Sequence, residues 1–293
     1  MTQHLSSSAE HSTLIDKYET FLFDCDGVIW LGSKLIPGVK ESIEYLKCKG
    51  KKLIFITNNS SVSRADYVKK FAKFGIEVDE SNIFGSSFAT AVYLKEVANF
   101  DPEKFVFAIG GKGISDELES QGIKILSPDF PQIENLDDIS GIEPDNRVGA
   151  VVVGLDVKIN YAKLAFAHVN IIQGDSYFIA TNSDSTLPVG GITFPGAGSL
   201  LSVLKSSTKK DPVVIGKPNQ IMFDLVKKSH HLDLSKTIMV GDRLDTDIDF
   251  GNRASVDTLL VYTGVTDKTL ASNSDIKATF SMNSFGDISL LKQ

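Results

Sequence analysis

The amino-acid sequence predicts an α/β protein built on a doubly wound parallel sheet. Short, continuously apolar runs alternate along most of the chain with segments whose apolar residues recur at helical spacing. Several apolar runs end in clusters of acidic and polar residues, as strands do at the ligand-binding edge of an open α/β sheet. The length of 293 residues suits roughly two domains, at about 150 residues per domain.

The apolar runs predict the strands. Continuous apolar runs, unlike alternating ones, are typical of parallel strands that helices cover on both faces. We expect strands at residues 20–23, 53–56, 105–109, 148–153, 177–180, 213–215, 238–240 and 259–261.

The segment after the first strand shows how the helices are delimited. Val39, Ile43 and Leu46 recur at helical spacing, so they fall on one face of a helix. Pro37-Gly38 precedes this helix and Gly50 follows it. Glycine is common just past a helix end, so we expect the helix to stop there.

The composition excludes several classes of protein. With 30 basic and 37 acidic residues the net charge is −7, whereas a nucleic-acid-binding protein needs a basic face. Cys25 and Cys48, the 2 cysteines, are too few for a disulfide scaffold or a cysteine-based zinc site. No apolar run approaches the roughly 18 residues of a membrane span, and residues 1–17 lack the apolar centre of a signal peptide. We expect a cytoplasmic protein that binds neither nucleic acid nor membrane, with residues 1–17 as a disordered lead-in.

Four polar segments follow predicted strands and carry the residue types of a catalytic site. They are Asp24-Cys25-Asp26-Gly27, Thr57-Asn58-Asn59-Ser60, Gly216-Lys217-Pro218, and the segment 241–247 with Asp242 and Asp247. Ligands of open α/β sheets bind at the carboxyl ends of strands, so these segments can converge on one crevice.

The residue types in these segments describe metal-assisted phosphoryl transfer. Aspartates brought together in one crevice would repel one another, and their pKa values would rise. A hard divalent cation removes this repulsion, and Mg²⁺ prefers a few carboxylates, water and a phosphate oxygen of the substrate. Lys217, Thr57 and Asn58 offer donors for the other phosphate oxygens. One aspartate can attack phosphorus while another carries the proton of the leaving group.

The motifs, in this order, resemble those of the haloacid dehalogenase superfamily of phosphatases. That superfamily places Asp-x-Asp-Gly after its first strand, Thr or Ser after its second, then a Lys, and an acidic Gly-Asp motif last. The segments Gly27-Val28-Ile29-Trp30 and 241–248 are most similar to the group of 4-nitrophenylphosphatase, phosphoglycolate phosphatase and pyridoxal phosphatase. That group carries a large α/β cap between its second and third motifs, and the span from Thr57 to Lys217 leaves room for one.

The resemblance implies a domain arrangement and an assembly. A Rossmann-like core would comprise residues 18–98 and 209–293, and an α/β cap domain residues 99–208. A homodimer formed through the cap is implied as well, with a small phosphorylated metabolite as substrate.

The resemblance also implies roles for individual residues. Asp24 would attack phosphorus to form an aspartyl-phosphate, and Asp26 would protonate the leaving oxygen and then activate water. Mg²⁺ would be held by Asp24, the main-chain carbonyl of Asp26, and Asp242. The remaining assignments are Thr57, Asn58, Asn59 and Lys217 as phosphate ligands, and Asp247 as a carboxylate that reaches the metal directly or through water.

The segment 181–188, Thr-Asn-Ser-Asp-Ser-Thr-Leu-Pro, resembles the substrate-specificity loop of this group. In members selective for pyridoxal phosphate, a histidine precedes the proline and contacts the pyridine ring. Leu187 stands at that position here and cannot donate a hydrogen bond. Small phospho-acids such as 2-phosphoglycolate are therefore expected to be better substrates than pyridoxal phosphate, unless the segment is only a surface turn.

Several other functions are possible on the same fold. They are a pyridoxal phosphatase or phosphoprotein phosphatase of the same family, a phosphomutase, a dehalogenase, and a catalytically silent binding protein. The intact pair of Asp24 and Asp26 argues against the silent protein. The second aspartate of that pair also favours phosphoryl transfer over dehalogenation.

Overall fold

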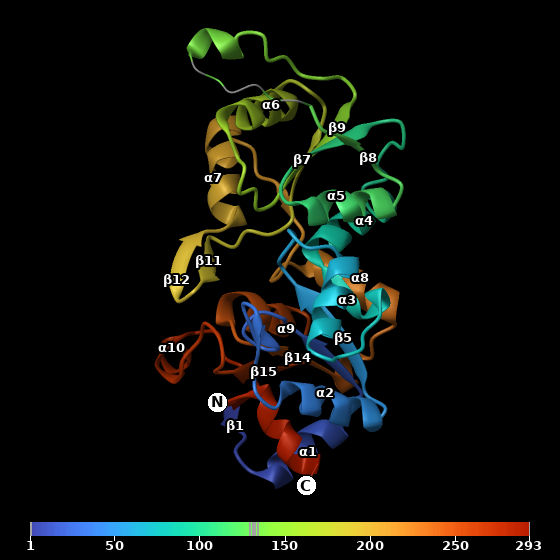
Figure 1. Cartoon of the computed structure of the whole chain (residues 1–293), viewed down its shortest axis with the longest axis vertical. Helices are drawn as coiled ribbons and strands as arrows, with labels where there is room; N and C mark the ends of the chain where they lie inside the picture. Colours follow the sequence, from blue (N-terminus) through green and yellow to red (C-terminus); the bar gives the residue numbers. More distant parts are fainter. Residues whose placement is uncertain (1, 129, 131–132, 134, 293) are drawn as a thin grey trace. The chain divides into compact units, whose positions relative to one another are not determined.

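The structure, a computed structural model, describes residues 2–128, 130, 133 and 135–292 and divides into two units (Figure 1). Unit 1 comprises Met1–Thr57, Ala65–Phe84 and Lys217–Gln293, and unit 2 comprises Asn58–Arg64 and Gly85–Gly216. The cap domain predicted at residues 99–208 falls inside unit 2, which also takes in the segment 58–64 and the residues from Gly85 onward.

Unit 1 is built on a 7-stranded sheet with the strand order β1-β16-β15-β14-β2-β5-β6. In that order the strands are Gln3–His4, Phe280–Met282, Asp257–Val261, Thr237–Gly241, Thr20–Phe23, Lys52–Thr57 and Ile83–Gly85. β2 pairs in parallel with β14 on one side and β5 on the other, so that Phe23 lies beside both Val240 and Phe55. The polar segments that follow these three strands therefore emerge at one edge of the sheet.

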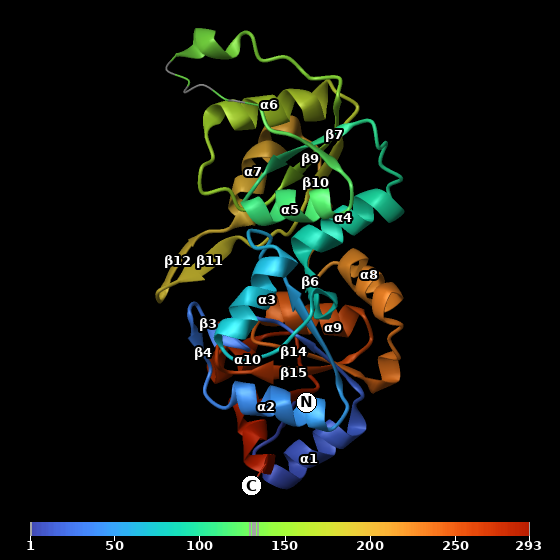
Figure 2. The ribbon, with the colours of Figure 1, turned by 45° about the vertical axis from the view of Figure 1, so that its right-hand side comes forward.

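Helices cover both faces of this sheet, and α2 and α9 lie on opposite sides of β14 and β15 (Figure 2). Aromatic side chains fill the space between the layers: Phe23 contacts Phe285 and Phe55 contacts Phe71, with ring centroids 4.8 and 4.5 Å apart. The α-helices are α1 (Ser8–Lys17), α2 (Val39–Cys48), α3 (Arg64–Lys73), α8 (Gln220–His230), α9 (Asp249–Arg253) and α10 (Lys268–Asn273). Shorter elements are the 3₁₀ turns η1 (Glu80–Asn82), η3 (Leu234–Lys236) and η5 (Phe285–Lys292), the π-helical turn η4 (Leu244–Ile248), and the β3 (Trp30–Leu31)–β4 (Lys34–Leu35) hairpin.

The expectation of a disordered lead-in at residues 1–17 is wrong. β1 extends the sheet by pairing in parallel with β16, and α1 follows it directly. Ser7 and Glu10 form a capping box at the start of α1, and Leu14 and Ile15 are buried. The polar residues that suggested disorder supply the helix cap and its exposed face.

Unit 2 contains a 5-stranded sheet with the order β13-β10-β9-β7-β8. In that order the strands are Val213–Val214, Tyr177–Ala180, Val148–Val153, Phe105–Ile109 and Lys124–Leu126, and all neighbours are parallel. α6 (Tyr161–Ile172) and α7 (Ala197–Thr208) pack on one face, and α4 (Ser86–Glu96) and α5 (Lys112–Ser120) lie on the other (Figures 1 and 2). The unit also contains η2 (Leu136–Ile139) and a hairpin of β11 (Thr186–Val189) and β12 (Ile192–Pro195).

Every strand predicted from the apolar runs occurs, within one residue or two at each end. The helix predicted between Gly38 and Gly50 is α2. Among residues 2–128, 130, 133 and 135–292, no helix combines the length and the apolar character that a bilayer crossing requires.

Candidate active site

Lys217 is the centre of a buried charge cluster at the carboxyl edge of the unit 1 sheet. Its ammonium donates hydrogen bonds to Asp24 Oδ1 at 2.5 Å, to Asp247 Oδ1 at 2.8 Å and to the Ile56 carbonyl at 3.0 Å. The side chain is 1 % exposed. Burial opposes its positive charge, but the two carboxylates outweigh burial and raise the pKa of Lys217 above its usual value.

Three aspartates share this cluster. Oxygen atoms of Asp24, Asp242 and Asp247 all lie within 4.8 Å of one another. Burial raises the pKa of Asp242 to about 7, and repulsion from Asp247 adds to the shift. Burial also raises the pKa of Asp24 well above its usual value, although Lys217 opposes the shift.

The charge balance of the cluster fits a bound divalent cation. One buried ammonium neutralises only part of the charge that three ionised carboxylates would carry, and a hard cation with oxygen ligands offsets the remainder. Within the described part of the chain, this is the one group of three acidic, histidine or cysteine side chains close enough to hold a metal ion.

The carboxylate of Asp247 also fixes the backbone of this edge. Its Oδ2 accepts hydrogen bonds from the backbone N–H groups of Asp242 and Arg243, both at 3.1 Å, while its Oδ1 accepts from Lys217. The carboxylate of Asp242 accepts from the backbone N–H of Val265 at 2.6 Å. Asp247 therefore connects the lysine to the strand-end loop that carries Asp242.

Two glycines make room for these carboxylates. A Cβ at Gly27 would lie 2.5 Å from the carboxylate of Asp242, and the φ of +90° there also favours glycine. A Cβ at Gly241 would lie 2.1 Å from the Cβ of Asp247. The glycine of each acidic motif is thus required by the close approach of an aspartate.

Asp26 lies outside the buried cluster, and its side chain is exposed. Its Oδ1 accepts a hydrogen bond from the indole Nε1 of Trp30 at 2.9 Å. Between the two aspartates of the motif, Cys25 is fully buried, and burial raises the pKa of its thiol well above the usual value. The thiol is therefore kept in its unreactive protonated form.

The Thr-Asn-Asn segment after β5 is divided between the units. Thr57 ends β5 in unit 1, where it is buried with its Oγ1 3.4 Å from the Tyr67 hydroxyl. Asn58 belongs to unit 2, where its amide nitrogen donates to both carboxylate oxygens of Asp184, at 3.1 and 3.2 Å. The Asn59 side chain accepts from the backbone N–H of Ser61 at 3.0 Å.

The backbone at Asn58 is anchored as well. Its carbonyl accepts hydrogen bonds from Ser86 Oγ and from the amide of Asn182, both at 2.7 Å. Asp184 lies within the segment 181–188, but the sequence did not identify it as the partner of Asn58. A polar residue in a loop does not identify its partner, because the contact joins residues 126 positions apart.

Leu187 lies in β11 of a hairpin and is only partly exposed. It faces Phe194 in the antiparallel register, and Gly190-Gly191 forms the turn with φ values of 60° and 84°. Part of the segment predicted as a polar loop is therefore a strand, because the glycine pair supplies the positive φ values of a tight hairpin turn.

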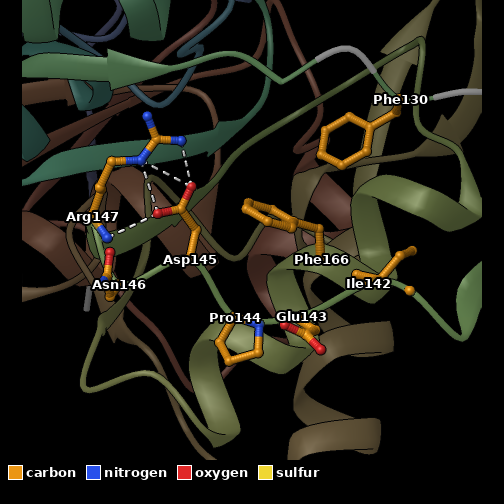
Figure 3. Close-up of a pocket in the computed structure, with 9 residues that line it drawn as sticks. Phe130, Ile142, Glu143, Pro144, Asp145, Asn146, Arg147 and Phe166 are labelled. Carbon is orange, nitrogen blue, oxygen red and sulfur yellow. Dashed lines mark hydrogen bonds and ion pairs between the residues drawn. The ribbon is translucent and has the colours of Figure 1, made fainter.

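Unit 2 also contains a hollow of about 680 Å³, lined in part by Phe130, Pro144 and Phe166 (Figure 3). The one charged pair drawn at its wall is Arg147 with Asp145, whose nearest atoms are 2.6 Å apart. This pairing lowers the pKa of Asp145. Its lining residues include none of the three clustered aspartates and not Lys217, all of which belong to unit 1.

Comparison with known proteins identifies the family. A family model described as haloacid dehalogenase-like hydrolase matches residues 21–124, and a related HAD-like hydrolase model matches residues 214–288. Phosphoglycolate phosphatase 2 of Arabidopsis thaliana is 44% identical over 274 residues, which is 91% of this chain and 90% of the relative. A 4-nitrophenylphosphatase of Schizosaccharomyces pombe is 39% identical over 269 residues, which is 90% of each chain.

A solved structure agrees with these sequence matches. The 4-nitrophenylphosphatase of Thermotoga maritima superimposes with a TM-score of 0.80 at 31% identity, covering 96% of this chain and 99% of the other. The two relatives and the solved structure each cover at least 90% of this chain. The two family models include all four polar segments of the sequence. The chain therefore belongs to the haloacid dehalogenase-like hydrolases.

Proposed function

We propose that the protein is a Mg²⁺-dependent phosphomonoester hydrolase that acts through an aspartyl-phosphate on Asp24. The observation that carries the proposal is the buried Asp24 carboxylate, which pairs with Lys217 beside Asp242 and Asp247. A nucleophile, a cation for the phosphate charge and a carboxylate that could bind a metal, Asp242, are thus assembled at one strand edge. The phosphatase names of the relatives support the same reaction.

The reaction has two steps in which Asp24 and Asp26 share the chemistry. A carboxylate oxygen of Asp24 bonds to phosphorus, the bond from phosphorus to the leaving oxygen breaks, and Asp26 gives its proton to that oxygen. Asp26 then takes a proton from water as the water oxygen attacks phosphorus, which frees phosphate and restores Asp24. The exposure of Asp26 suits a group that meets both the leaving oxygen and water.

The Lys217 ammonium, and Mg²⁺ when bound, would stabilise the phosphoryl charge. Lys217 offers a fixed ammonium at the point where negative charge spreads over phosphoryl oxygens in the transition state. When bound, Mg²⁺ would neutralise part of the same charge, held by Asp24, Asp242 and the main-chain carbonyl of Asp26. The hydrogen bonds of Asp247 support a role in holding Lys217 and the Asp242 loop rather than in direct metal ligation.

The phosphate ligands predicted after β5 have unequal support. The buried Thr57 hydroxyl at the end of β5 suits a phosphate contact. The side-chain nitrogen of Asn58 donates to Asp184, and the side-chain oxygen of Asn59 accepts from Ser61. We therefore propose the Thr57 hydroxyl as the principal side-chain donor to the phosphate from this segment.

The proposed substrate class is small phosphorylated metabolites, with 2-phosphoglycolate among the better ones. Relatives are named for phosphoglycolate, 4-nitrophenyl phosphate and, in Gallus gallus, glycerol 3-phosphate. Leu187 offers no hydrogen bond that would select a pyridine ring, and an apolar site discriminates weakly between leaving groups. A kcat/KM for pyridoxal phosphate at least tenfold above that for 2-phosphoglycolate would contradict this substrate class.

Release of phosphate from 4-nitrophenyl phosphate tests the reaction itself. Purified protein with Mg²⁺ should yield nitrophenol and phosphate in equal amounts, and the Asp24→Asn variant prepared in parallel should yield neither. A wild-type protein that binds phosphate esters without releasing phosphate would instead support a silent binding protein.

Two further expectations stay predictions. A homodimer should give about twice the chain mass of 31.9 kDa in light scattering at micromolar concentration, and the mass of a single chain would refute it. A cytoplasmic location should place the protein in the cytosolic fraction of its native cells.

A further inference from the structure

We infer that Trp30 is a positioning residue that orients the Asp26 carboxylate for proton transfer to the leaving oxygen. The inference rests on the proposed function, because it refines how the proton donor of that reaction is held. Its basis is the hydrogen bond from the indole Nε1 to Asp26 Oδ1 at 2.9 Å.

The backbone of the loop after β2 creates this contact. The chain turns back on itself, so that the backbone N–H of Gly27 donates to the Trp30 carbonyl at 2.7 Å and that of Trp30 to the Cys25 carbonyl at 3.3 Å. An isolated bridge joins Asp26 to Trp30 in the same turn. A residue four positions after Asp26 is thereby brought beside its side chain.

The indole is a rigid anchor for an exposed carboxylate. Trp30 is fully buried, with its ring 4.8 Å from that of Phe71 and 5.8 Å from that of Phe74. The ammonium of Lys70 lies 3.9 Å from the ring centre, where a cation–π contact further fixes the indole. The donor is therefore immobile, while the acceptor lies at the surface.

The hydrogen bond affects Asp26 in two ways. It restricts the rotamers of a side chain that would otherwise move freely in solvent. It also occupies Oδ1 with a donor, so that the transferable proton resides on Oδ2. Among residues 2–128, 130, 133 and 135–292, no other group donates a hydrogen bond to this carboxylate.

The leaving group provides a test that separates positioning from folding. 4-Nitrophenolate is a weak base that departs without a proton, whereas the alkoxide of glycerol 3-phosphate is a strong base that needs one. The parameter kcat/KM reports the first phosphoryl transfer. For the Trp30→Phe variant, we expect kcat/KM to fall at least tenfold more for glycerol 3-phosphate than for 4-nitrophenyl phosphate.

Two controls separate the loss of the indole hydrogen bond from the loss of indole packing. Phe74→Leu loosens the packing of the same indole but leaves Nε1–H in place. It should therefore lower kcat/KM equally for both substrates or for neither. Trp30 is the sole tryptophan of the sequence. Global replacement of tryptophan by its analogue with sulfur in place of the ring N–H therefore removes only this hydrogen bond and keeps the shape. It should reproduce the selective loss even if Trp30→Phe folds poorly.

The outcomes distinguish the inference from the proposed function. A selective loss on the alkyl ester in the analogue protein supports positioning of Asp26. Equal losses on both substrates, or no loss, would overturn the role of Trp30 while leaving the phosphatase reaction intact. Wild-type protein without activity on either ester would overturn the proposed function and this inference together.

Discussion

At Asp24, the charge needed for attack on phosphorus is opposed by the burial of the side chain. Burial raises its pKa, and Lys217 at 2.5 Å is the group that opposes this rise most strongly. Asp24→Asn keeps the shape of the side chain but removes the attacking charge. Turnover of 4-nitrophenyl phosphate should fall by about a thousandfold or more with the fold intact.

Circular dichroism and steady-state kinetics on the same Asp24→Asn sample check this prediction. Unchanged far-UV spectra with lost turnover support a nucleophile. If the variant keeps more than about a tenth of the wild-type rate, Asp24 is not the nucleophile.

Asp247 and Asp245 form a matched pair for testing the acidic motif. Asp247 is 1 % exposed and pairs with Lys217, whereas Asp245 is 65 % exposed and pairs with Arg243. Asp247→Asn should lower kcat about 10- to 100-fold, because Lys217 and the Asp242 loop lose the charge that holds them. Asp245→Asn should leave kcat within about twofold, and a comparable loss in both variants would disprove the specific role of Asp247.

The sequence allowed the charged residues of the site to be predicted, but not their connections. β2 and β14 pair in parallel, so their ends meet and bring Asp24 to Asp242 and Asp247. Lys217 follows β13, a strand of the unit 2 sheet, so strand pairing does not account for its place in the cluster. The partner of Asn58 could not be predicted in this way, because Asp184 reaches it only through the tertiary path of the chain.

At the scale of elements, α1 depends on an exposed cap. Hydrogen bonds from the backbone of Ser6, and from the hydroxyl and backbone of Ser7, lower the pKa of Glu10 from 4.5 to about 2. A carboxyl whose pKa is lower in the folded than in the unfolded state stabilises the fold fully at pH values above the unfolded-state pKa. This stabilisation is lost as the pH falls through the folded-state pKa. The cap of α1 should therefore weaken between about pH 4.5 and 2.

A ¹³C NMR titration of the Glu10 carboxyl checks this expectation. Its midpoint should lie near 2 in the wild type and rise in Ser7→Ala, which removes the hydroxyl donor. A wild-type midpoint at the ordinary value of 4.5 would show that the capping box does not persist in solution.

Element length explains which parts of the fold the sequence could predict. β7, β9 and β10 are continuous apolar runs and were predicted at their observed limits. β1 has 2 residues and β16 has 3, too few to show any periodicity. β1 is defined by its pairing with β16, and β16 by its pairing with β1 and β15. The π-helical turn η4 is defined by backbone hydrogen bonds five residues apart, such as that from Ile248 N–H to the Arg243 carbonyl at 3.1 Å, which residue propensities do not encode.

At the scale of the whole molecule, the buried carboxylates link metal binding to folding. Three aspartates within 4.8 Å destabilise the folded chain when they are charged, and a cation bound only by the folded state relieves that repulsion. Saturating Mg²⁺ should raise the melting temperature by a few degrees, since ligand at 100 times its dissociation constant contributes about 2.7 kcal/mol. Differential scanning fluorimetry of metal-stripped protein with and without Mg²⁺ measures this shift independently of turnover.

The same metal should govern activity. Chelation with EDTA should abolish phosphate release, and added Mg²⁺ should restore it. Ca²⁺ should also raise the melting temperature but should inhibit phosphate release, because its larger and looser coordination shell distorts the in-line geometry of attack on phosphorus. Asp242→Asn removes one ligand from the acidic group and should lose both the thermal shift and the turnover. Full activity in metal-stripped protein, or a Mg²⁺-dependent shift that survives in Asp242→Asn, would mean that the buried aspartates of this edge do not hold the metal.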